Sequence, residues 1–87
     1  MPGLARVGVD TAGGVIQGGG QSTVFCNGSL VAVIGDAVAG HGRAPHSSPV
    51  MVEGSSTVFA EGIGVCREGD KATCGHPATG SEDTFAS

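Results

Sequence analysis

The chain has 87 residues with four basic and eight acidic side chains, which give a formal net charge of −4. The basic residues form no patch, so nucleic-acid binding is not expected, and no apolar run of about 18 residues predicts a membrane span. The N-terminal sequence lacks the charged head and apolar stretch of a signal peptide. This length predicts a single domain over residues 1–87, with a core so small that a metal, a disulfide or a partner often supplies stability.

The apolar stretches predict short β-strands, because they are rich in Val, Thr, Phe and Ile and are bounded by glycine-rich turns. No stretch keeps helical spacing for more than about two turns. Asn27-Gly28 between two apolar runs is the strongest short signal for a hairpin, and Glu61-Gly62 is a weaker turn in the corresponding place. The expected class is all-β. In chain order, strands are expected at 15–16, 23–26, 30–34, 50–52, 58–60 and 64–66.

Parts of the chain repeat each other, which predicts three short β-hairpin units related by pseudo-threefold symmetry. Two copies of a Ser-Thr-Val-Phe segment and of a Gly-Asp pair are each shifted by 34 residues, and a third copy is visible only in the spacing. A meander sandwich with coincidental similarity is the alternative. The matching parts are 22–25 with 56–59, 35–36 with 69–70, and the 15-residue intervals Asp10 to Phe25 and Asp70 to Phe85.

The repeat also predicts the core. All three aromatic residues, Phe25, Phe59 and Phe85, occupy equivalent positions of the units. Because no unit alone could bury its phenylalanine, we expect one inward-facing core anchor per unit. Cys26 and Cys66 lie in strand-like runs beside small apolar residues, where two buried thiols are favoured over a disulfide between them.

The middle copy of the repeat is longer by eight residues, and this insertion carries His41 and His46. Cys74 and His76 lie in the corresponding loop of the next copy, since both loops follow a Gly-Asp pair. If the units superpose, these four side chains converge as a complete tetrahedral set for zinc, with iron less favoured. Four protein ligands leave no position for water, so the metal would be structural. The alternative is a set of surface-loop histidines and an unremarkable thiol.

A Cys-His nucleophile pair is a second interpretation of the same residues. It would combine Cys74 with His41 or His46, and Asp36 or Asp70 would orient the imidazole. Because the Gly-Asp pair recurs with the repeat, a turn role for the aspartates is favoured over a catalytic one.

The order of these motifs, a Ser-Thr-Val-Phe strand, a turn ending in Gly, and a closing Gly-Asp, resembles the PAAR-repeat family. The tetrapeptide Pro-Ala-Ala-Arg has drifted in this chain, with Ala32 and Arg67 retained in the two clear copies and Leu4-Ala5-Arg6 as a third trace. The resemblance covers nearly the whole chain. The matching segments are 21–28 and 54–62 for the strand and turn, 30–33 and 64–67 for the tetrapeptide, and 34–36 and 68–70 for the end.

The resemblance implies a pointed, three-faced β cone with a zinc ion near its vertex, held at His41, His46, Cys74 and His76. It implies no reaction. One monomer would cap a trimeric β-helical spike in a type VI secretion system or a contractile phage tail, and sharpen it for piercing a target envelope. The expected partners are the spike trimer and, transiently, the target membrane; the protein would be made in the cytoplasm and delivered by the machine. A small zinc-stabilised binding module unrelated to spikes is the alternative.

Overall fold

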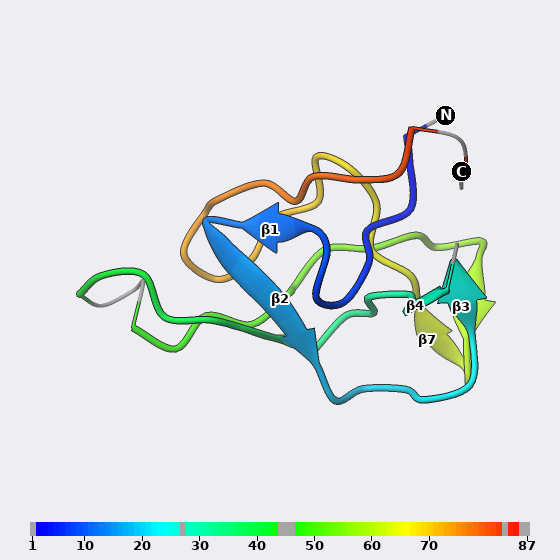
Figure 1. Cartoon of the computed structure of the whole chain (residues 1–87), viewed down its shortest axis with the longest axis horizontal. Helices are drawn as coiled ribbons and strands as arrows, with labels where there is room; N and C mark the ends of the chain where they lie inside the picture. The colour runs from blue at the N-terminus through cyan, green and yellow to red at the C-terminus, as the bar shows by residue number, and fades with distance from the viewer. Residues whose placement is uncertain (1, 27, 44–46, 83, 86–87) are drawn as a thin grey trace.

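The computed structural model describes residues 2–26, 28–43, 47–82 and 84–85, and in these ranges it is built from short β-strands (Figure 1). None of the described segments forms a helix long and apolar enough to cross a membrane. The all-β prediction is therefore confirmed. The strands are β1 (Thr11–Ala12), β2 (Gly14–Gly18), β3 (Phe25–Cys26), β4 (Ser29–Leu30), β5 (Ala37–Val38), β6 (Phe59–Ala60) and β7 (Ile63–Gly64).

The strands form one three-stranded antiparallel sheet, in the order β1-β2-β5, and two separate hairpins, β3-β4 and β6-β7. Phe25 pairs with Leu30 in the first hairpin, and Phe59 pairs with Gly64 in the second, so each turn has the predicted length. In the second hairpin Glu61 has a φ of 51°, and the Gly that follows it has a φ of 79°. Two positive φ angles in succession are typical of a type I′ turn, so the weaker hairpin signal is also confirmed.

A third unit is formed by segments from opposite ends of the described chain. Gly3 makes an antiparallel bridge to Phe85, in the register that Phe25 and Phe59 have in their hairpins. The N–H of Leu4 donates to the carbonyl of Thr84 at 2.9 Å, and the N–H of Ser81 donates to the carbonyl of Leu4 at 2.8 Å. The segments around residues 3 and 85 thus replace a hairpin with a non-covalent pairing.

A closed cycle of backbone hydrogen bonds joins the three units at the centre of the fold. Ala5 N–H donates to Cys66 at 3.0 Å, Cys66 N–H donates to Ala32 at 2.8 Å, and Ala32 N–H donates to Ala5 at 2.9 Å. All three residues are 0% exposed. Ala32 and Cys66 occupy the third position of the drifted tetrapeptide, and Ala5 occupies the equivalent place in the third trace, so these traces meet as three equivalent segments. The pointed cone itself stays a prediction.

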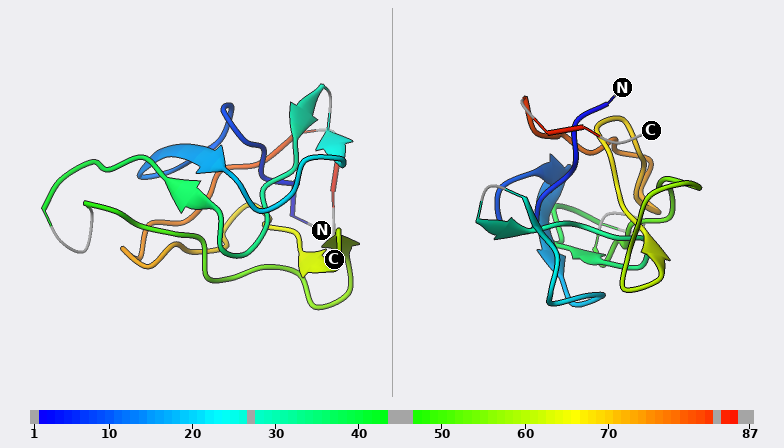
Figure 2. Two further views of the ribbon diagram at one scale, coloured as in Figure 1. Left: turned by 90° about the horizontal axis from the view of Figure 1, so that it is seen from below. Right: turned by 90° about the vertical axis from the view of Figure 1, so that its right-hand side faces the viewer.

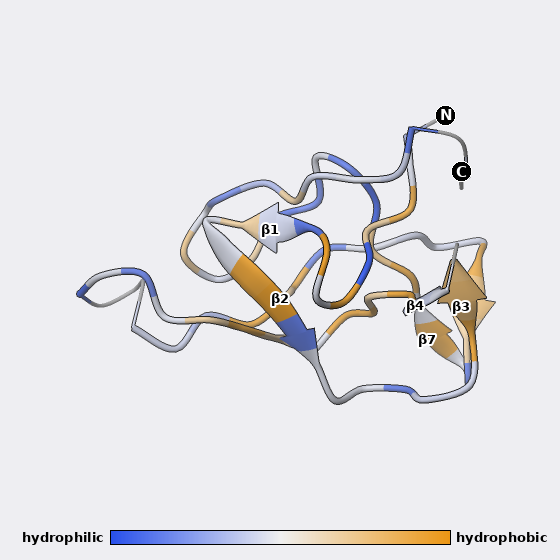
Figure 3. Ribbon diagram, in the orientation of Figure 1, coloured by the Kyte–Doolittle hydropathy of each residue, from blue (hydrophilic) through white to orange (hydrophobic). Residues whose placement is uncertain are grey.

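The buried core consists of small and medium aliphatic side chains, and the prediction that the phenylalanines face inward is wrong. Phe25, Phe59 and Phe85 are 59%, 56% and 48% exposed. The residue after each of the first two, Cys26 and Ala60, is buried instead, because successive side chains of a strand point to opposite faces. Because the backbones of Ala5, Ala32 and Cys66 are hydrogen-bonded to one another, the centre of the fold has room only for small side chains. Figure 3 shows the apolar character of β3 and β7 at the outer end of the fold.

Three aspartates close equivalent turns, which confirms the turn role of the repeated Gly-Asp. In two of the turns an arginine guanidinium also donates to the carboxylate, from Arg6 at 2.7 Å and from Arg67 at 2.9 Å. Burial alone would raise the pKa of Asp10, but hydrogen bonds from Arg6 and Thr79 outweigh it and hold that pKa below its ordinary value. The backbone N–H groups that donate to the carboxylates are Arg6 to Asp10 at 2.9 Å, Val33 to Asp36 at 2.9 Å, and Arg67 to Asp70 at 2.8 Å.

Candidate metal site

Two loops carry the predicted ligands, and each leaves the fold just after one of the aspartate turns. His41 follows β5, which begins directly after Asp36. Cys74 and His76 lie in a tight turn that is closed by hydrogen bonds from Gly75 N–H to Ala72 at 2.9 Å and from Ala72 N–H to His76 at 3.2 Å. The equivalence of the two loops, predicted from the repeat, therefore places three of the four candidate ligands near one another.

The donor atoms of His41, Cys74 and His76 lie within 4.8 Å of one another. His41 Nε2 is 2.9 Å from His76 Nδ1, and Cys74 Sγ is 3.6 Å from the same nitrogen. Tetrahedral zinc with ordinary Zn–N and Zn–S bonds separates its ligand atoms by about 3.3 to 3.7 Å. The three side chains are partly buried, and this spacing means that they could hold one metal ion.

Neighbouring carbonyls orient two of the donors. The Ala39 carbonyl lies 3.1 Å from His41 Nδ1, and because a carbonyl accepts only, this contact places the proton on Nδ1 and makes Nε2, which faces His76 Nδ1 at 2.9 Å, the nitrogen with the lone pair. The Ala12 carbonyl lies 3.8 Å from Cys74 Sγ. Imidazole nitrogens and a thiol at this spacing are the donor chemistry that zinc and iron accept. His46, the fourth predicted ligand, lies outside the described residues.

A family model described as the PAAR motif matches residues 9–79 of the chain, which include His41, Cys74 and His76. The chain belongs to the PAAR motif family. Comparison with curated proteins found no match. The PAAR family is structural rather than enzymatic, and it is associated with spike-tip proteins of type VI secretion systems and contractile phage tails.

Among the residues that the structure describes, the contacts of Asp36 and Asp70 do not support the Cys-His hydrolase considered from the sequence. The Asp36 carboxylate accepts N–H groups of Gly20 and Val33 at 2.8 and 2.9 Å, and the Asp70 carboxylate accepts the Arg67 guanidinium. Both carboxylates are thus engaged in turns, which leaves them unsuited to orient a catalytic imidazole.

The two remaining cysteines of the PAAR domain, Cys26 and Cys66, are buried free thiols, as the sequence predicted. Burial raises the pKa of Cys66 to about 12, and the nearby charges of Asp70 and Asp36 act in the same direction. A thiol that is buried and keeps its proton fills space in the core and does not act as a nucleophile.

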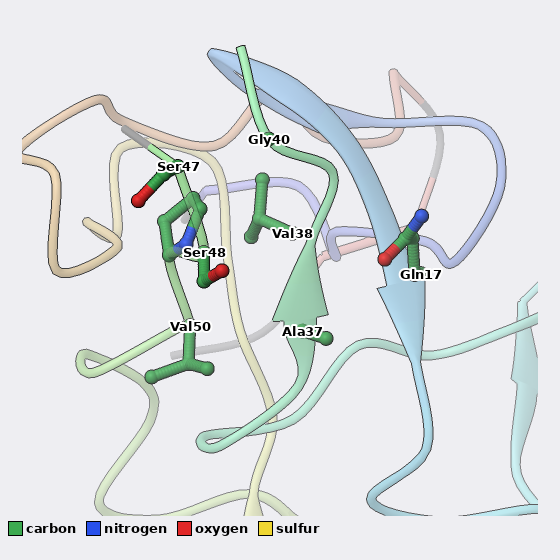
Figure 4. A pocket seen from close by; sticks show the side chains of 8 residues that line it. Gln17, Ala37, Val38, Gly40, Ser47, Ser48 and Val50 are labelled. Atoms are coloured by element: carbon green, nitrogen blue, oxygen red, sulfur yellow. The ribbon is translucent and has the colours of Figure 1, made fainter. Parts of the chain in front are cut away.

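A shallow cavity of about 240 Å³ lies beside β5, and its lining includes none of His41, Cys74 and His76 (Figure 4). Its described lining consists of uncharged side chains, among them Gln17, Val38 and Ser48. The cavity is smaller than the roughly 300 to 1,000 Å³ typical of small-molecule sites. Its chemistry offers no group for acid-base or nucleophilic work, so the ligand cluster is the candidate functional site of this domain.

Two kinds of residue were missed by reasoning from the sequence alone. One is the set of exposed phenylalanines, whose equivalent positions were recognised but whose direction was not. The other is Gly13, the residue between β1 and β2, which lies against the donor atoms of His41 and His76. Its position in the repeat could have identified it. Gly13 lies in the loop after Asp10, just as His41 lies in the loop after Asp36 and Cys74 in the loop after Asp70.

Proposed function

We propose that this chain is a spike-tip protein that caps the trimeric β-helical spike of a contractile injection machine, one tip per trimer. It sharpens the spike for passage through a target envelope, and its role is mechanical. Its partners are the spike trimer and, transiently, the target membrane. It reaches a phage tail tip or a secretion spike as part of the machine. Membership in the PAAR family supports this assignment.

The exposed phenylalanines are the observation that carries the proposal. Phe25, Phe59 and Phe85 occupy equivalent positions of the three units and expose about half of each side chain. The segments that carry them gather at one end of the 32 Å long axis (Figures 1 and 2). Exposed apolar side chains grouped in this way mark a surface that another protein covers. Burying the exposed half of one phenylalanine contributes about 0.8 to 1.5 kcal/mol, half of the value for a fully exposed side chain.

The arrangement of the units supports a trimeric partner. The central hydrogen-bond cycle relates Ala5, Ala32 and Cys66 as equivalents, so the three outer segments are presented in three similar environments. A spike with true threefold symmetry offers three copies of one surface, which a monomer with three similar units can match. The edges of the short hairpins at this end are also places to which strands of a β-helical spike can add.

The metal site stabilises the other end of the molecule. The segment after β5 that carries His41 extends away from the hairpins (Figure 2). We propose that a zinc ion joins His41, Cys74, His76 and His46 and ties the two loops together. Metal binding free energy then becomes folding free energy, which suits a part that must stay rigid under load.

The test is co-purification with a trimeric β-helical spike protein of a contractile injection machine. The expected complex contains one chain per spike trimer, measured by native mass spectrometry. Phe25→Ser and Phe59→Ser should each weaken the complex by roughly 4- to 12-fold, in line with the free energy of burying the exposed half of one side chain. Val15→Ser, at an exposed valine on β2, is the matched control and should leave the complex intact. The proposed capping function would be refuted if the chain binds no spike trimer, or if the phenylalanine variants bind the trimer as well as wild type does.

A further inference from the structure

Gly13 is the one residue between the paired strands β1 and β2, since Ala12 pairs with Gly14 across the turn. Its φ is +90°, a conformation that favours glycine. The turn follows Asp10 and therefore occupies, in the first unit, the place that the ligand-bearing loops occupy in the other two. All three loops that follow an aspartate turn thus meet at the ligand cluster.

The missing side chain of Gly13 leaves space between the two imidazoles. A Cβ atom at this position would lie 2.5 Å from His41 Nε2 and closer still to His76 Nδ1. Those nitrogens are themselves 2.9 Å apart. A zinc ion sits about 2.0 to 2.1 Å from each ligand nitrogen. The volume that the Cβ would fill is therefore close to the volume that an ion bound to both imidazoles requires.

The backbone around Gly13 contacts both ligand loops. A Cβ on Gly14 would collide with the carbonyl oxygen of Ala39, so the segment that carries His41 approaches the turn as closely as backbone allows. Ala39 N–H donates to Val15 at 2.8 Å, which holds that approach. On the other side, the Ala12 carbonyl lies 3.8 Å from Cys74 Sγ.

We propose that Gly13 is a positioning residue for the metal: the first unit supplies no ligand, but supplies the turn that spaces the imidazoles and leaves room for the ion. This inference rests on the metal site proposed above. A side chain at position 13 would occupy the place of the ion or push the two nitrogens apart. The requirement for glycine is then twofold, in backbone conformation and in space.

The experiment compares two glycine-to-alanine variants that share the backbone strain and differ in the space around the new methyl group. Gly69 has a φ of +93°, and a Cβ there would meet no atom within 4 Å. Zinc affinity is measured by competition with a chromophoric chelator, and coordination by the visible and thiolate bands of the cobalt-substituted protein. Gly13→Ala should lower zinc affinity by about 10- to 100-fold and alter the cobalt bands. Gly69→Ala should change affinity less than threefold.

Wild-type zinc affinity and wild-type cobalt bands in Gly13→Ala would overturn the positioning role. If Gly13→Ala fails to fold, the same substitution is made in metal-free protein that carries both His41→Ala and His76→Ala. Removing both imidazoles removes the collisions with the new methyl group and leaves only the backbone strain, so Gly13→Ala should then lower the denaturant midpoint no more than Gly69→Ala does in the same background. A larger loss for Gly13→Ala than for Gly69→Ala in that background refutes the proposal. If the wild-type protein binds no metal but still forms the spike complex, the proposed metal site is wrong and the proposed capping function stands.

Discussion

Cys66 is buried at the centre of the fold, where both its backbone and its thiol make contacts. Its backbone N–H and carbonyl both belong to the central cycle, and its thiol lies 3.4 Å from the carbonyl of Glu53. The side chain is fully buried, and burial raises the pKa of the thiol to about 12. Its place in the chain is the third position of the drifted tetrapeptide, where Ala32 and Ala5 are its equivalents. A small apolar side chain is what this crowded position admits.

Stability should therefore fall at alkaline pH. The thiol of an unfolded chain ionises near pH 8.5 to 9, whereas Cys66 holds its proton until about pH 12. Between these values the folded state binds more protons than the unfolded state, so the free energy of unfolding decreases as pH rises. Denaturant midpoints measured from pH 8 to 11 should decline in wild type, and the decline should be shallower in Cys66→Ala. Equal slopes in the two proteins would contradict this assignment.

The direction of the phenylalanines could not be predicted from their spacing. Equivalent positions indicate equivalent environments, but a strand of two residues has one side chain on each face, and nothing in its pattern says which face is covered. The choice is made by the central cycle, which brings Ala5, Ala32 and Cys66 together and excludes aromatic rings from the centre. That cycle joins residues 61 positions apart in the chain, beyond the reach of local patterns.

At the scale of the elements, the hairpins and aspartate turns were predictable because their signals are local. Asn-Gly, Glu-Gly and the recurring Gly-Asp each determine a few adjacent dihedral angles or one nearby hydrogen bond. The third unit was not predictable in the same way. Gly3 and Phe85 are not joined by a short turn sequence. Their pairing can be recognised only by its correspondence to the pairs in the two complete hairpins.

Joining the two ends of the chain should stabilise the third unit. Linking Ser87 to Met1 would place four residues between Phe85 and Gly3, the number between Phe25 and Leu30 and between Phe59 and Gly64. The link restricts the unfolded chain, which raises the free energy of unfolding by about 2 to 4 kcal/mol if the native pairing is unstrained. Guanidinium unfolding of the cyclic and linear proteins measures the gain. A lower midpoint for the cyclic protein would mean that these segments do not pair as a hairpin does.

At the scale of the whole molecule, metal removal should loosen the fold without dismantling the hairpins. An ion present at about 1,000 times its dissociation constant adds about 4 kcal/mol to the free energy of unfolding, or roughly 15 to 30 °C in Tm for a domain of this size. Chelator-treated protein should show that loss in calorimetry and recover on adding zinc. Cys74→Ser should show the low Tm with or without zinc, while Cys26→Ser should still respond. A Tm that is indifferent to chelator would count against the site.

The pairing of residue 3 with residue 85 also has a consequence for synthesis on the ribosome. Ala5 of the central cycle is translated 61 residues before its partner Cys66, and Leu4 is translated 80 residues before its partner Thr84. The central cycle cannot close until Cys66 has been made, and the third unit cannot pair until Thr84 has been made. Contacts of such long sequence separation slow folding, because the chain must lose entropy before they form. The folding rate of this domain should therefore depend on how quickly the segment around residue 85 pairs with the segment around residue 3.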